Sequence, residues 1–200
     1  MTKIKLCGNF RVEDADLLNK VHPDMAGIIF APGQRRTVNL MTALKIRDRL
    51  DGNIPLYGVF VNQNVMDMLT FFSTGLIQGV QLHGDESELE VTLLREKNVP
   101  VIQVVKPQQA LIKTAANYVL LDNEFGSGKT FDWRIVPPKP LRQTPLMLAG
   151  GLTTDNLQDA INQIQPEWVD ISSGDEVSGI KNLEKMRALV DIVRQQTDRK

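Results

Sequence analysis

Eight short β-rich segments recur along the 200-residue chain, and each is followed by a segment long enough for a crossover connection. Parallel strands need crossovers of a dozen or more residues, which usually contain a helix. Eight such units without a break favour an α/β fold in which residues 1–200 form a single-domain (β/α)8 or TIM barrel, near the small end of its size range. An open doubly wound sheet is the alternative. The predicted strands are Ile4–Cys7, Ala26–Phe30, Leu56–Val61, Gly79–Leu82, Val101–Val105, Tyr118–Leu121, Leu146–Leu148 and Val169–Ile171.

Between the strands, apolar residues repeat at i, i+3, i+4 and i+7, the spacing of one helix face. We expect Asn39 and Asp155 to cap helix N-termini and Gly52 to mark a helix end. The stripes are Val65, Met68, Leu69 and Phe72; Leu157, Ala160, Ile161 and Ile164; and Leu183, Met186, Val190 and Val193.

Charge and cysteine content exclude several classes of protein. With 23 Lys and Arg against 24 Asp and Glu, the net charge of −1 gives no general attraction to nucleic acid. The single cysteine, Cys7, cannot form an internal disulfide, which suits a reducing compartment. No apolar run approaches the roughly 20 residues that span a bilayer, and Met1–Gly8 has no signal-peptide core. We therefore expect a cytoplasmic protein with no nucleic-acid or membrane partner.

Three predicted strands end in polar groups: the first closes on Cys7, the fourth is followed by His83 and the sixth is followed by Asp122. Strand alternation predicts that all three face the barrel axis and converge at its rim. A thiol and a carboxylate across a small pocket suit proton transfer in both directions. Taken singly, a cysteine is often a small buried hydrophobe and an aspartate a helix cap.

Glycine-rich loops follow the sixth, seventh and eighth strands, at Gly126–Thr130, Ala149–Thr153 and Ser172–Gly174. Glycine lets backbone N–H groups approach an anion, and a helix N-terminus adds partial positive charge. These loops predict a phosphate site, with ordinary turn glycines as the alternative. We expect the N–H groups of Gly151 and of Ser173 or Gly174 to contact the phosphate.

Two further features concern charged side chains. Arg36, which follows Arg35, could grip a carboxylate with two hydrogen bonds or lie solvated in its loop. Lys5 and Asp170 fall on the inward faces of the first and eighth strands, so we expect them to pair, with Gln81 nearby. Two histidines and one cysteine make a zinc site improbable, and no metal site is expected.

Motifs in register along nearly the whole chain resemble the phosphoribosylanthranilate isomerase family of tryptophan biosynthesis. Any one of them is modest evidence, but their order is specific. They are Lys3-Ile4-Lys5-Leu6-Cys7-Gly8, Gly27-Ile28-Ile29-Phe30 with Arg36, Gly58-Val59-Phe60-Val61-Asn62, Gln81-Leu82-His83-Gly84-Asp85-Glu86, Leu120-Leu121-Asp122 with Gly126–Trp133, Leu148–Leu152 and Val169–Gly174.

The resemblance implies an Amadori rearrangement of N-(5-phospho-D-ribosyl)anthranilate to 1-(2-carboxyphenylamino)-1-deoxy-D-ribulose 5-phosphate, the third step from chorismate to tryptophan. It implies that Asp122 is the acid that opens the ribose ring and Cys7 the base at C2′. It implies that Arg36 binds the anthranilate carboxylate and that His83 is a residue of the substrate pocket. No cofactor is implied, the partner is a small-molecule substrate, and the chain is a monomer or homodimer. The implied phosphate-binding residues are Gly128, Gly150, Gly151, Ser172, Ser173 and Gly174.

Departures from the family pattern leave alternatives open. Asn9 replaces an apolar residue, and Asp175 introduces a carboxylate that either weakens phosphate binding or points away. The loop Asn123–Phe125 is also short. Another sugar-phosphate isomerase of the same barrel class, such as the Amadori enzyme of histidine biosynthesis, is one alternative. That enzyme uses a pair of aspartates, and this chain has Cys7 where the first of them would stand. A non-catalytic barrel that binds a phosphometabolite is the other.

Overall fold

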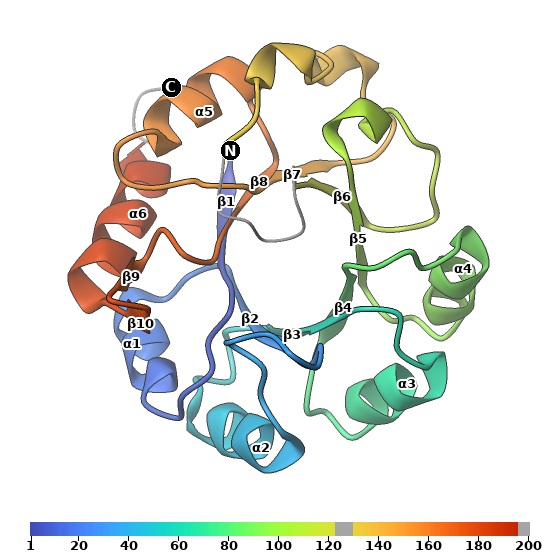
Figure 1. Cartoon of the computed structure of the whole chain (residues 1–200), viewed down its shortest axis with the longest axis vertical. Coiled ribbons are helices and arrows are strands. Elements are labelled where there is room, and N and C mark those ends of the chain that lie inside the picture. The colour runs from blue at the N-terminus through green and yellow to red at the C-terminus, as the bar shows by residue number, and fades with distance from the viewer. Residues whose placement is uncertain (123–129, 196–200) are drawn as a thin grey trace.

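Eight parallel strands close into a barrel in sequence order, with helices around its outside (Figure 1). The structure is a computed structural model that describes residues 1–122 and 130–195. Each strand begins and ends within one residue of its predicted bounds, and closure of the barrel excludes the open-sheet alternative. The strands are β1 (Lys3–Leu6), β2 (Met25–Ile29), β3 (Leu56–Phe60), β4 (Gly79–Leu82), β5 (Val101–Val105), β6 (Tyr118–Leu121), β7 (Leu146–Leu148) and β8 (Trp168–Ile171).

The helical stripes are confirmed, but two of the eight expected helical crossovers are not. After β5 the chain forms only the short 3-10 turn η1 (Pro107–Gln109), and after β6 the described residues form η2 (Trp133–Ile135) and η3 (Lys139–Leu141). Prolines interrupt both segments, and a proline inside a helix removes a hydrogen bond and clashes with the preceding turn. In the ranges that the structure describes, no helix is both long and apolar enough to cross a membrane. The α-helices are α1 (Asp14–Val21), α2 (Leu40–Arg49), α3 (Val65–Ser73), α4 (Glu88–Glu96), α5 (Leu157–Ile164) and α6 (Leu183–Gln195).

Of the three predicted helix boundaries, the cap at Asn39 is confirmed, whereas the cap at Asp155 and the stop at Gly52 are wrong. The side chain of Asn39 accepts a hydrogen bond from the backbone of Thr42 and so caps α2. Asp155 lies one residue too early to cap α5, where Asn156 occupies the N-cap position. α2 ends at Arg49, before the predicted stop at Gly52.

The barrel interior holds an ion pair among apolar side chains. Lys5 on β1 stands opposite Asp170 on β8 in the register that closes the barrel, and its Nζ lies 2.9 Å from Asp170 Oδ1. Lys5 Nζ also donates to Gln81 Oε1 at 2.7 Å. The predicted pair and its neighbour are therefore confirmed. These two interactions of the Lys5 ammonium offset part of the free-energy cost of burying its charge.

A short hairpin that the sequence analysis did not predict follows β8. Its strands are β9 (Glu176–Val177) and β10 (Ile180–Lys181), and Glu176 pairs with Lys181. The two residues of its turn, Ser178 and Gly179, both have positive φ, as a tight type I′ hairpin turn requires. The hairpin follows β8 and precedes α6 in the chain, and it lies beside α6 and α1 at the edge of the barrel (Figure 1).

Candidate active site

A cavity of about 380 Å³ opens at the carboxyl ends of the strands, the face at which barrels of this kind hold their active sites. The structure brings most of the predicted site residues to its wall. Gly174 does not line the cavity, although its neighbour Ser173 does, and Gly128 falls outside the described residues. The predicted residues that line the cavity are Cys7, Arg36, His83, Asp122, Gly150, Gly151, Ser172 and Ser173.

Cys7 directly follows β1 and is buried, with only 4% of its surface exposed. A Cβ atom added to Gly27 on the neighbouring strand would lie 2.6 Å from Cys7 Sγ, so only glycine leaves room for the thiol. Burial raises the pKa of the Cys7 thiol, while the charge of Lys5 opposes that rise. Burial therefore favours the protonated thiol, and the charge of Lys5 limits that preference without reversing it.

Asp122 and His83 follow β6 and β4 on the cavity wall. His83 Nε2 lies 3.6 Å from Asp122 Oδ2, and His83 Nδ1 lies 3.4 Å from Gln81 Nε2. Because Gln81 also accepts from Lys5, a chain of polar contacts runs from the barrel interior to Asp122. The strand-end alternation correctly predicted that these side chains meet Cys7 at one cavity.

The loops after β7 and β8 line the cavity with glycine and serine residues. Gly150 and Gly151 have φ values of 86° and 64°, in the region that favours glycine. Among the described residues, no acceptor takes the N–H of Gly151, Ser173 or Gly174. A Cβ on Gly174 would lie 1.9 Å from the carbonyl oxygen of Leu152, so these two loops pack backbone against backbone. Such unused N–H groups can bind an anion.

The expected help from helix N-termini is absent directly after these loops. α5 begins at Leu157, after a turn, and α6 begins only at Leu183, beyond the hairpin. The partial charge of a helix terminus acts within about its first turn, so α6 does not reach Gly174. Backbone N–H groups are therefore what these loops offer to an anion.

Arg36 is held by a carboxylate that the sequence analysis missed. Its Nε donates to Glu176 Oε1 at 2.6 Å, and Arg35 Nη2 donates to Glu176 Oε2 at 2.6 Å. Burial acts to raise the pKa of Glu176, but the hydrogen bonds from Arg36 and Arg35 and the charges of Lys181 and Arg36 together outweigh burial and lower that pKa. The Ser-Gly pair that turns the hairpin was the one sequence signal that could have placed Glu176 here.

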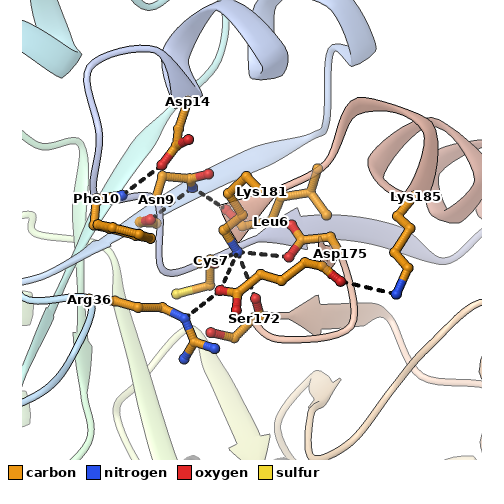
Figure 2. A network of polar contacts seen from close by, with 12 residues as sticks. Leu6, Cys7, Asn9, Phe10, Asp14, Arg36, Ser172, Asp175, Lys181 and Lys185 are labelled. Carbon is orange, nitrogen blue, oxygen red and sulfur yellow. Dashed lines mark hydrogen bonds and ion pairs between the residues drawn. The ribbon is translucent and has the colours of Figure 1, made fainter. Parts of the chain in front are cut away.

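Two of the three departures from the family pattern, Asn9 and Asp175, lie away from the cavity, and the third, the loop Asn123–Phe125, lies outside the described residues. Asp175 is fully buried, pairs with Lys181 Nζ at 2.8 Å and does not line the cavity. Burial raises its pKa to about 6 in spite of Lys181. Asn9 is also buried and donates from its amide to the carbonyl oxygens of Leu6 and Gly27, which fixes the turn after β1 (Figure 2).

The chemistry that this cavity supports is acid–base work on a doubly anionic molecule. A thiol and a carboxylate line it together, an arginine can bind one anionic group, and N–H-rich loops can bind another. Within residues 1–122 and 130–195, no cluster of three or more His, Cys, Asp or Glu side chains could hold a metal ion.

Comparisons with known proteins agree with this geometry. Residues 4–192 match the family model described as N-(5'phosphoribosyl)anthranilate (PRA) isomerase. The chain is 39% identical over 197 residues to the N-(5'-phosphoribosyl)anthranilate isomerase of Lactiplantibacillus plantarum, covering 98% of this chain and 93% of the relative.

Solved structures give the same result. The phosphoribosyl anthranilate isomerase of Thermotoga maritima superposes with a TM-score of 0.88 at 31% identity, over 98% of this chain and 100% of the other. A third relative, with a TM-score of 0.81 at 27% identity over 98% and 100% of the two chains, is a phosphoribosyl anthranilate isomerase in complex with reduced 1-(o-carboxyphenylamino)-1-deoxyribulose 5-phosphate.

Proposed function

The chain belongs to the phosphoribosylanthranilate isomerase family of tryptophan biosynthesis, and we propose that Cys7 and Asp122 carry out its Amadori rearrangement. The substrate is N-(5-phospho-D-ribosyl)anthranilate, and the product is 1-(2-carboxyphenylamino)-1-deoxy-D-ribulose 5-phosphate. Substrate and product are isomers, so the enzyme has only to move protons and bonding electrons within one molecule.

Asp122 acts first, as the general acid. It gives its proton to the ribose ring oxygen as the bond from that oxygen to C1′ breaks, and the lone pair of the anthranilate nitrogen forms the Schiff base. In the fraction of the protein in which Cys7 is ionised, its thiolate then removes the proton from C2′, and the electrons of that C–H bond form an enolamine. The enolamine tautomerises to the ketone when its hydroxyl loses a proton and C1′ gains one. The substrate's own nitrogen accepts the electrons, so we propose no metal or organic cofactor.

The observation that carries this assignment is that Cys7 and Asp122 end two different strands and line the same cavity. General acid and base residues must both reach the reacting atoms of one bound substrate. A ligand that fills the cavity can contact both.

Binding is assigned to the remaining residues of the wall. Arg36 takes the anthranilate carboxylate, because guanidinium matches a carboxylate with two parallel hydrogen bonds. The N–H groups of Gly151 and of Ser173 or Gly174 bind the phosphate, and Gly150 and Ser172 shape the two loops. Gly128 is also assigned to phosphate binding. His83 lies beside Asp122 as a substrate contact rather than as an essential acid or base.

We further propose that residues 1–200 act as one catalytic domain in the cytoplasm, as a monomer or homodimer, on this small molecule and without nucleic acid or membrane. Light scattering coupled to size-exclusion chromatography distinguishes the two oligomeric states.

The direct test follows the loss of phosphoribosylanthranilate fluorescence, with the substrate generated in situ. Wild type should consume it, and Cys7→Ser and Asp122→Asn should each lower kcat by at least about a hundredfold, the low end of what general acid–base groups contribute. Asp155→Asn is the matched control, because it neutralises an exposed carboxylate outside the cavity. Substantial kcat in both site variants, with the fold intact, would reject the mechanism. Binding of the reduced product analogue without turnover would instead favour a non-catalytic barrel.

A further inference from the structure

The contact between Glu176 and Arg36 joins the hairpin after β8 to the loop after β2. Its distance of 2.6 Å is that of a strong charge-assisted hydrogen bond. The contact uses only Nε of Arg36. No described residue accepts a hydrogen bond from either Nη atom, and the side chain lines the cavity. Figure 2 shows both Nη atoms of Arg36 pointing away from the dashed contact at Nε.

A guanidinium held in this way has one orientation instead of many. An arginine side chain carries about 2 kcal/mol of rotamer entropy, which a free Arg36 would lose on binding a carboxylate. With Nε already bound, the four N–H bonds on the two Nη atoms form a fork fixed before the ligand arrives. The geometry points to Glu176 as a positioning residue that presents this fork to the anthranilate carboxylate, an inference that rests on the proposed role of Arg36.

Glu176 is itself held from several sides. Arg35 binds its second carboxylate oxygen at 2.6 Å and also donates to the carbonyl of Gly179 in the hairpin turn. Lys185 donates to the backbone carbonyl of Glu176 at 3.0 Å. The carboxylate is nearly buried, with 6% of its side chain exposed. It is therefore a rigid support for Arg36.

Lys181 anchors the hairpin to the catalytic end of the barrel. Its fully buried ammonium donates to the carbonyl oxygens of Cys7 and Ser172, each at 2.6 Å, and to Asp175 at 2.8 Å (Figure 2). The same Nζ lies 3.9 Å from Glu176 Oε1. The support for Arg36 is thus tied to the strand end that carries the base and to the loop that follows β8.

The charge of this cluster suits the proposed role. A lone glutamate beside Arg36 would repel the substrate carboxylate, but here cations outnumber carboxylates. The surplus positive charge leaves Arg36 able to attract an anion. The cations are Arg35, Arg36 and Lys181, and the carboxylates are Asp175 and Glu176.

The test uses two ligands that differ only in the group that Arg36 binds. One is reduced 1-(o-carboxyphenylamino)-1-deoxyribulose 5-phosphate, and the other is the same molecule without its carboxyl group. We expect Glu176→Ala to raise the Kd of the first about tenfold, the effect of weakening one charge-assisted hydrogen bond, and to leave the Kd of the second within about twofold. Glu176→Gln, which keeps an acceptor for Nε, should fall between wild type and Glu176→Ala. In turnover, the loss should appear in KM more than in kcat.

Two controls separate positioning from general damage. Glu184→Ala removes an exposed glutamate of α6 and should leave both Kd values unchanged. In an Arg36→Met background, Glu176→Ala should have no further effect on the carboxylated ligand, because it acts through Arg36. Equal weakening of both ligands by Glu176→Ala, no weakening of either, or an additive effect in that background would overturn the inference. If Glu176→Ala does not fold, the same comparison is made with Glu176→Gln.

The proposed function fails separately from this inference. Both titrations are independent of turnover, so a wild-type protein without isomerase activity would contradict only the proposed mechanism. Wild type that binds the two ligands equally would show that Arg36 does not bind the carboxylate, and the inference would fall with that role. Wild type that discriminates between them, with Glu176→Ala discriminating equally well, would overturn the inference alone.

Discussion

Lys5 and Asp170 form an ion pair inside the barrel, where β1 and β8 meet. Lys5 lies on β1, two residues before Cys7 in the chain. Neither side chain is appreciably exposed, with 0% and 7% of their surfaces accessible. Burial alone would lower the pKa of Lys5, but the charges of Asp170 and Cys7 and the hydrogen bonds to them together outweigh burial and raise that pKa. The pair therefore stays ionised, and its stabilisation is present below the unfolded lysine pKa and lost as the pH rises through the higher native value.

Asp170→Ala should destabilise the protein by about 3–5 kcal/mol, because it leaves the buried ammonium of Lys5 without its counter-charge. The free energy of unfolding from urea titrations at neutral pH measures the loss. Asp155→Ala, which removes an exposed aspartate, is the control and should stay within about 0.5 kcal/mol of wild type. If Asp170→Ala unfolds at nearly the same urea concentration as wild type, the pair does not stabilise the barrel.

This pair was predictable because the strands of a closed parallel barrel are so regular. Strands buried on both faces appear as short apolar runs, and alternation then places every second residue inside. The segments after β5 and β6 broke that regularity, because Pro107 and the prolines near Lys139 leave 3-10 turns where helices were expected. In these two segments the prolines prevent the helix that the strand–helix repeat predicts.

The support around Arg36 could not be predicted in the same way. Cys7, His83 and Asp122 each follow a recognisable strand, so their positions come from local pattern. Glu176 and Lys181 act through partners 140 and 174 residues away, and only the hairpin brings them there. A charged residue in a loop carries no sequence signal for which distant side chain it will meet.

Alkylation of Cys7 by iodoacetamide should report a raised thiol pKa. Burial favours the protonated thiol more strongly than Lys5 favours the thiolate, and only the thiolate reacts. We expect the rate, normalised to its alkaline plateau, to reach half-maximum at a higher pH in the native protein than in the urea-unfolded chain, which should titrate near about 8.5. Cys7 is the only cysteine, so the label is unambiguous. A native midpoint at or below the unfolded one would contradict the prediction.

Asp175 should make the native state less stable as the pH rises from about 4 to about 7. Its pKa is about 6 in the native protein and about 3.9 in an unfolded chain, so between these values the native state binds more protons. Its contribution is therefore full below about pH 4 and is lost as the pH rises through 6. Asp175→Asn removes this ionisation and keeps an oxygen for Lys181.

The measurement is the free energy of unfolding of wild type minus that of Asp175→Asn, followed against pH. We expect this difference to fall by about 1–3 kcal/mol between pH 4 and pH 7, since one pKa unit corresponds to about 1.4 kcal/mol. Asp155→Asn should show no such fall. A difference that stays constant or increases with pH would show that Asp175 is not destabilised by its burial.

Gly174→Ala should weaken phosphate binding although Gly174 has no side chain to contact the substrate. The new Cβ would lie 1.9 Å from the carbonyl oxygen of Leu152, and that oxygen is backbone, so one of the two proposed phosphate loops must move. A displacement of about 1 Å in a binding group can cost up to about a hundredfold. We expect KM for phosphoribosylanthranilate and the inhibition constant of inorganic phosphate both to rise about tenfold or more. Gly52→Ala is the matched control, because no atom lies within 4 Å of its added Cβ, and wild-type values for both variants would remove these loops from the phosphate site.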